Sequence, residues 1–211
     1  MVMTVTSVKQ QTCSEVGCSV YRVGLSDGSL FSIKTSYLPI EQGEIPLCTL
    51  NREVSTDEVA ALRHASACLR CETAALRLVS HAEQTSYGLS RKLEQRDHGA
   101  SCVKAVMTRL TELEIVSDRR YAELWLHSRL SRGGDSPRRM SASLRNKGID
   151  GAVVSAALKT SLSLEKETRL LQRFVEKKRL ADADRRFLKQ SLRAEGFSGA
   201  ALQAWEDGDG E

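Results

Sequence analysis

Two cysteines three positions apart, Cys68 and Cys71, form the most recognisable metal-binding pattern in the chain. Thiolates at this spacing supply half of many structural zinc sites, which need a second pair of cysteine or histidine ligands. No matching pair follows, because Cys13 and Cys18 are spaced differently and the four histidines are scattered. On a helix, Cys68 and Cys71 would lie on one face and serve as small apolar packing residues. We therefore expect no metal site and no cofactor.

A cysteine and a histidine four positions apart, His98 and Cys102, are the nearest approach to a nucleophile with its base. Such a pair also needs a group that orients the base and a site that stabilises an oxyanion. The sequence offers neither, and it contains no glycine-rich phosphate-binding loop. We expect a protein that is not an enzyme.

Basic residues are concentrated between Ser128 and Gly148, although the net charge of the whole chain is only +4. The single acid in this stretch is Asp135. Such a local excess favours an anionic partner, either nucleic acid or an acidic protein surface, although a solvated helix face would have the same composition. The cations are Arg129, Arg132, Arg138, Arg139, Arg145 and Lys147.

Two of these cations, Arg138 and Arg139, follow Pro137 in the first turn of a predicted helix. Positive charge there opposes the helix dipole, and a choice that works against local stability indicates a use elsewhere. Guanidinium groups bind carboxylates or phosphates through two hydrogen bonds at once. We add four basic residues further along the chain as candidates for binding a partner: Lys177, Lys178, Arg185 and Arg186.

The elements that carry these residues repeat along the chain. The segment from Leu144 to Asp150 recurs 48 residues later, from Leu192 to Ser198, and a weaker copy lies 51 residues earlier, from Leu93 to Gly99. The two clearer copies have a glycine where a helix would stop and a short polar residue that caps the next helix. Self-similarity at this period is typical of a stack of small helical units.

The middle unit shows the pattern best. A polar cap at Ser117 begins its first helix, Pro137 begins its second, Gly148 ends that helix, and Asp150 caps its third. Apolar residues at helical spacing predict its core: Tyr121, Leu124, Trp125, Met140, Leu144, Ile149, Val153, Val154 and Leu158. In the units on either side we predict helices over residues 57–82, 86–96, 101–113, 164–179, 182–195 and 198–205.

The first 50 residues differ from the rest. Apolar residues alternate over 19–25 and 30–35, on both sides of Asp27 and Gly28, a pair that supplies the positive φ values of a tight hairpin turn. A lone hairpin is marginally stable, so it should gain a third strand or pack on the helices. We predict a mostly α protein: an elongated array of three tandem three-helix, helix-turn-helix-like repeats with a small N-terminal β-hairpin module. The expected divisions are 1–52, 53–115, 116–160 and 161–211.

No apolar run approaches the roughly 20 residues that span a bilayer, and the N-terminus lacks the pattern of a signal peptide. We therefore expect a cytoplasmic protein without a membrane partner. Nothing in the pattern requires a dimer, so a monomer is the expectation.

The middle unit resembles the middle repeat of the RecX recombination regulators. The resemblance is carried by residues 117–129, by Arg132 and Gly133, by 137–140 and by 144–149. It covers residues 57–205 and is most specific over 117–158. Two departures stand out. The first unit has an aspartate where the family's helix stop is usual, and the third has lost the basic residue before its glycine.

The resemblance implies a function. RecX proteins are built of tandem three-helix units, bind RecA nucleoprotein filaments in their groove, and inhibit RecA ATPase and strand exchange; some also bind DNA. It implies a negative modulator of RecA in DNA repair, homologous recombination and the SOS response, with the six cations of the middle unit carried over as contact positions. It also implies at most weak, non-specific binding of single- or double-stranded DNA. The alternative is a helical DNA-binding module that regulates independently of RecA.

Overall fold

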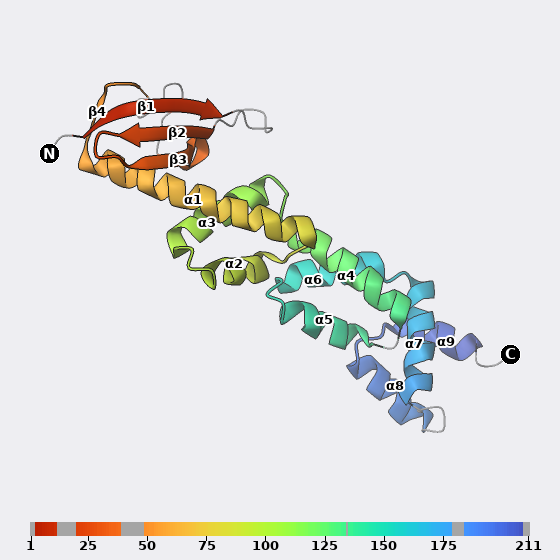
Figure 1. The fold of residues 1–211 in the computed structure, drawn as a ribbon. Helices are drawn as coiled ribbons and strands as arrows, with labels where there is room; N and C mark the ends of the chain where they lie inside the picture. The colour runs from red at the N-terminus through yellow and green to blue at the C-terminus, as the bar shows by residue number, and fades with distance from the viewer. Residues whose placement is uncertain (1–2, 12–19, 39–48, 134, 179–183, 209–211) are drawn as a thin grey trace. The chain divides into compact units, whose positions relative to one another are not determined.

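The computed structural model describes residues 3–11, 20–38, 49–133, 135–178 and 184–208. It is mostly helical with a small N-terminal strand module, as the sequence predicts (Figure 1). The chain forms two compact units, one from Met1–Ala82 and Leu89–Ile115 and the other from Glu83–Gly88 and Val116–Glu211. Cys13, Cys18, the start of the predicted helix 182–195 and the predicted elongation of the array lie outside what the structure describes.

The strand module is a four-stranded sheet with the order β3-β2-β1-β4. Strands β2 (Val20–Leu25) and β3 (Leu30–Lys34) form the predicted antiparallel hairpin. Of the two turn residues, only Gly28 has a positive φ, of 85°. The expectation that Asp27 also has one is wrong, because its carboxylate accepts a hydrogen bond from the Ser29 backbone at 2.8 Å and shapes a longer turn.

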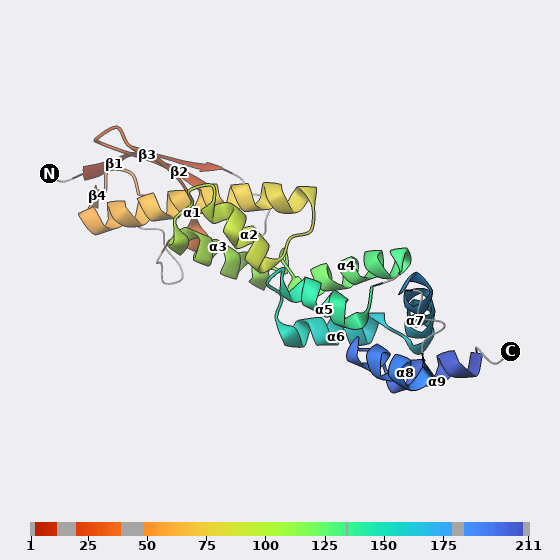
Figure 2. The same ribbon diagram turned by 90° about the horizontal axis from the view of Figure 1, so that it is seen from below.

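The hairpin gains further strands and a helix, as its marginal stability requires. Strand β1 (Met3–Gln11) pairs antiparallel with β2, and the short β4 (Glu53–Val54) pairs with β1. The sheet lies along the N-terminal part of α1 (Thr56–His81), as Figure 2 shows. Val5, Val23 and Ile33 are fully buried in the core that the sheet shares with this helix.

A buried ion pair also joins the sheet to the helices of the first unit. Lys34 Nζ at the end of β3 lies 2.7 Å from Glu72 Oε1 on α1. Arg109 Nε, from α3 (Ala100–Glu112), lies 3.7 Å from the same oxygen. Breaking such a pair would leave a buried charge without compensation, so the three residues fix the sheet, α1 and α3 in one arrangement.

The helices of the second unit follow the predicted pattern closely. Their bounds are α4 Asp118–Arg132, α5 Pro137–Arg145, α6 Gly151–Ser161, α7 Leu164–Lys178, α8 Arg185–Ala194 and α9 Gly199–Gly208. Helices α1 and α3 also match their predicted ranges to within one residue, and α2 (Ser86–Glu94) ends two residues early.

The predicted core of the middle unit is right except at Leu124. Met140, Leu144, Ile149 and Val154 are buried, and the partly buried members pack against them: Tyr121, Trp125, Val153 and Leu158. Leu124 is 55% exposed, whereas Ala122 and Leu126 are fully buried. Since Leu124 lies two positions from each of these, it points to the opposite side of α4. The buried stripe is centred one position away from the predicted one.

The helix stop is the clearest repeated feature. Asp97, Gly148 and Gly196 all have positive φ, of 60°, 83° and 89°. In each copy the next residue donates its backbone N–H to the carbonyl of a fully buried leucine, at 3.2–3.4 Å: His98 to Leu93, Ile149 to Leu144 and Phe197 to Leu192. This is the backbone pattern of a Schellman stop. The aspartate of the first copy therefore adopts the same backbone as the two glycines.

Candidate partner-binding surface

All ten basic residues proposed from the sequence are exposed. Arg138, Arg139 and Arg145 lie on α5, which Ser136 caps and Pro137 begins. Arg138 and Arg145 are two turns apart, and Arg139 lies beside the first of them. Among the described residues, no carboxylate forms an ion pair with these three side chains. We call them the α5 arginines.

Arg138 has an internal role that the sequence does not reveal. Its backbone N–H donates to the Glu195 carbonyl at 2.9 Å, and its Nη1 donates to the Ala194 carbonyl at 3.2 Å. The Ser136 hydroxyl donates to the Glu195 carboxylate. The guanidinium thus lies at the C-terminus of α8, where the helix dipole favours a cation. For Arg138 this contact offsets the unfavourable interaction with the dipole of α5, whereas Arg139 makes no such contact with the residues that the structure describes.

Two other cations lie over aromatic rings. Arg129 Cζ is 5.1 Å from the centre of the Trp125 ring, and Lys147 Nζ is 5.9 Å from the centre of the Tyr121 ring. Arg129 also lies 3.5 Å from an Asp135 carboxylate oxygen. At these distances the rings attract the cations and hold them in place. The two aromatic residues therefore support the basic surface while they pack, partly buried, against the core.

The remaining candidates lie on α7 and α8. Lys177 and Lys178 end α7, and Arg185 and Arg186 begin α8. Next to them Phe187 is 69% exposed, the largest exposed fraction among the large apolar side chains that the structure describes. An exposed aromatic ring next to cations in the sequence is a composition found at interfaces with other macromolecules.

A basic hollow between α4 and α7 was missed by the sequence analysis. It has a volume of about 290 Å³ and is lined by His127 and Leu130 of α4 and by three cations of α7: Lys166, Arg169 and Arg173. These cations recur at spacings of three and four, which place them on one side of α7. The spacing of the three cations is visible in the sequence and could have indicated a basic face. His127 lies about forty positions earlier, and only the fold brings it to the same hollow. The hollow suits a phosphate or carboxylate group.

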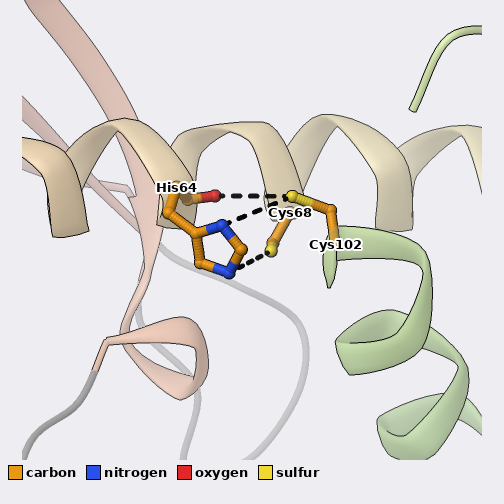
Figure 3. A group of neighbouring side chains, drawn as sticks. All are labelled: His64, Cys68 and Cys102. Carbon is orange, nitrogen blue, oxygen red and sulfur yellow. Dashed lines mark hydrogen bonds between the residues drawn. The ribbon is translucent and has the colours of Figure 1, made fainter. Parts of the chain in front are cut away.

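A second group of reactive side chains lies in the first unit, where His64 contacts Cys68 of the same helix and Cys102 of α3 (Figure 3). Burial, followed by the hydrogen bond with Cys102, raises the pKa of Cys68 to about 12, and burial raises that of Cys71 to about 11. A raised pKa keeps the thiols of Cys68 and Cys71 protonated, and a protonated thiol is a poor nucleophile. The histidine found in contact with Cys102 is His64, whereas the sequence pointed to His98 as its neighbour.

Within the described residues, no helix is both long enough and apolar enough to cross a bilayer.

The middle repeat matches the family model described as "RecX, second three-helix domain" over residues 117–158, which correspond to α4, α5 and α6. A regulatory protein RecX from Mycobacterium sp. (strain JLS) is 40% identical over 83 residues, covering 39% of this chain and 45% of that protein. Another, from Lactococcus lactis subsp. cremoris (strain SK11), is 26% identical over 181 residues, 81% of this chain and 63% of that protein. The predicted resemblance to the RecX family is confirmed.

Two solved RecX structures share the fold. One, described as a crystal structure of regulatory protein RecX, superposes with a TM-score of 0.66 at 21% identity and covers 97% of this chain and 99% of that one. RecX from Lactobacillus salivarius superposes with a TM-score of 0.54 at 23% identity. The match covers 68% of this chain and 96% of that one. The matched part of the chain spans about half the length of most of the curated RecX relatives. The RecX match over 117–158 contains the α5 arginines, Arg129, Arg132 and Lys147.

Proposed function

We propose that this protein is a RecX-type regulator that binds RecA filaments assembled on DNA and lowers RecA ATPase activity, strand exchange and filament growth. The observation that carries the proposal is the match of α4–α6 to the RecX middle repeat. In that part of the chain Arg139 and Arg145 are exposed and form no ion pair with a carboxylate of the described residues. The regulation needs no covalent step, because a bound protein that occupies the filament groove excludes other strands and subunits from it.

Charge-assisted hydrogen bonds are the means of binding. Each arginine can hold a carboxylate through two parallel N–H donors, and a hydrogen bond to a charged group contributes about 1.5–3 kcal/mol. Arg139 and Arg145 lie on one helix, so a regularly spaced acidic surface can engage both. The basic hollow at Lys166, Arg169 and Arg173 provides a further anchor for an anionic group. Several such contacts repeated along a filament would hold the protein in place.

Equilibrium binding of the full chain to three targets tests the proposal. The targets are RecA assembled on single-stranded DNA with a non-hydrolysable nucleotide, the same single strand without RecA, and a duplex of the same length. We expect tight binding to the filament, and binding to both naked DNAs that is at least about tenfold weaker, a difference of 1.4 kcal/mol. Equal affinity for filament and naked DNA would refute the proposal.

The same binding measurement also tests the second candidate function, a DNA-binding module that acts without RecA. The exposed cations of α5 and the basic hollow between α4 and α7 favour this alternative, because both suit phosphates. Binding through phosphates weakens steeply with salt, since neutralised phosphates release counterions. Selective binding to one duplex sequence that survives moderate salt would support this alternative.

A further inference from the structure

Three metal-binding side chains from two helices converge in the first unit. His64 and Cys68 are four residues apart on α1 and therefore lie on the same side of that helix. Cys102 comes from the first turn of α3, which packs beside α1 (Figure 3). Both cysteines are buried, and neither is part of a disulfide.

The distance from each sulfur to its nearest imidazole nitrogen matches the distance between two ligands of one tetrahedral ion. Cys68 Sγ lies 3.5 Å from His64 Nε2, and Cys102 Sγ lies 3.7 Å from His64 Nδ1. Zinc binds sulfur at about 2.3 Å and nitrogen at about 2.0–2.1 Å. At the tetrahedral angle, a sulfur and a nitrogen bound to the same ion lie about 3.6 Å apart. One donor atom from each residue lies within 4.8 Å of the other two. The exposed imidazole can turn and bring one nitrogen within reach of both sulfurs.

The charges also indicate the ion. Two thiolates and a neutral imidazole bring a charge of −2, which a divalent cation cancels. A neutral complex avoids the large penalty of burying net charge. Thiolate and imidazole ligands together favour zinc among the divalent ions, whereas magnesium and calcium require oxygen ligands.

A path for the ion exists on the histidine side. His64 is exposed and borders an open hollow of about 540 Å³, lined also by Tyr37 and Ala105. Cys71 does not belong to the group of close donors, so the described residues supply three ligands and leave the fourth position to solvent at this rim. Three ligands with one open position is a known arrangement for zinc.

We propose that His64, Cys68 and Cys102 bind one zinc ion that ties α1 to α3 in the first unit. Each thiol gives its proton to solvent as its sulfur bonds to the metal, so one ion releases two protons from the thiols. The bound ion stabilises this unit because the unfolded chain does not hold the three ligands together.

Cobalt titration of the full chain, reduced and under inert gas, tests the site. We expect one Co²⁺ per chain, with thiolate-to-cobalt charge transfer and the visible bands of tetrahedral coordination, and we expect one equivalent of Zn²⁺ to abolish both. The bound metal should raise the melting temperature of the protein. Absence of thiolate-to-cobalt absorption at one equivalent would overturn the proposal.

Variants identify the ligands. His64→Asn changes an exposed residue and should weaken binding by at least about tenfold, since even groups that support a ligand contribute that much. Cys102→Ala should remove part of the charge-transfer absorption. His81→Asn, the same change at an exposed position of α1, is the matched control and should bind as the wild type does.

The other cysteines are tested in the same way. A triple Cys13→Ser, Cys18→Ser, Cys48→Ser variant should retain full cobalt binding. Binding that persists in His64→Asn and Cys102→Ala but is lost in Cys71→Ala would assign the metal to the Cys68/Cys71 pair and refute the three-residue site.

Discussion

At the scale of single residues, neighbouring arginines of α5 have different surroundings. Arg138 donates hydrogen bonds to the last carbonyls of α8, whereas within the described part of the chain Arg139 has no such contact. The sequence places both in the first turn of a helix and cannot separate them, because the helix that Arg138 caps lies more than fifty residues away. Arg139 and Arg145 are therefore the positions at which charge can be reversed without disturbing this contact.

Reversing the charge of Arg138 should destabilise the second unit. A carboxylate would face the carbonyl end of α8 and lie near Glu195, so we expect Arg138→Glu to lower the free energy of unfolding by about 1 kcal/mol. Arg139→Glu places an acid in the first turn of α5, where the dipole favours it, and should change stability by less than about 0.5 kcal/mol. Urea unfolding followed by circular dichroism measures both. Equal losses in the two variants would contradict the role given to Arg138.

Leu124 and His64 differ from the sequence-based predictions for a common reason. Leu124 is apolar and fits a plausible stripe, but Ala122 shows that the buried stripe is centred elsewhere. A small residue such as alanine signals a close helix contact only once the partner helix is known. His64 was overlooked for a related reason, since its link to Cys102 crosses from α1 to α3.

At the scale of elements, local signals predicted the most. Short stretches of sequence determine the helix caps at Ser55, Ser117 and Asp150 and the helix stops at Gly148 and Gly196. The helices therefore begin and end close to the predicted residues. Strands β1 and β4 were not predicted. Their pairing depends on residues distant in the chain, and β4 has only two residues.

The helix stop at Gly148 gives an element-scale prediction. Its φ of 83° is unfavourable for any residue with a side chain, and a Cβ there would lie 2.3 Å from Tyr87 Cβ, within the same unit. We expect Gly148→Ala to lower the free energy of unfolding by more than about 2 kcal/mol. Gly199→Ala in α9 is the control, since a Cβ there meets no atom within 4 Å. It should be neutral or slightly stabilising. A loss under about 0.5 kcal/mol in Gly148→Ala, measured by urea unfolding, would show that the stop tolerates a side chain.

The cap of α1 gives a pH-dependent prediction. Glu58 accepts a hydrogen bond from the Ser55 backbone at 2.8 Å, which lowers the pKa of Glu58 below its ordinary value of 4.5, and Arg52 lowers it further. A lowered pKa contributes stability above pH 4.5 that is lost as the pH falls through the folded-state pKa.

We therefore expect Glu58→Gln to be less stable than the wild type at pH 7, by under about 1 kcal/mol, and the difference to shrink as the pH is lowered below 4.5. Urea unfolding over this pH range measures it. Glu176→Gln, at an exposed residue of α7, is the control and should show no such trend. A Glu58→Gln difference that stays constant with pH would mean that the carboxylate charge has no part in the cap.

At the scale of the whole molecule, the sequence predicts the fold class and the repeat, because both arise from patterns that recur along the chain. The resemblance to RecX is strongest where the described α5 arginines lie, and the comparisons support it there. The basic hollow and the proposed zinc site depend on packing between helices, which no local pattern encodes. The proposed function requires that Arg139 and Arg145 contact the RecA filament.

The most direct test is the ATPase activity of RecA on single-stranded DNA with this protein titrated in. We expect the wild type to inhibit. The double variant Arg139→Glu, Arg145→Glu should require at least about tenfold more protein for the same inhibition, since each lost charged contact contributes about 1.5–3 kcal/mol. The control reverses Arg70 and Lys104, exposed residues of the first unit, with the same change in net charge. It should inhibit as the wild type does. Unchanged inhibition by the Arg139/Arg145 variant, or an equal loss in the control, would contradict the account.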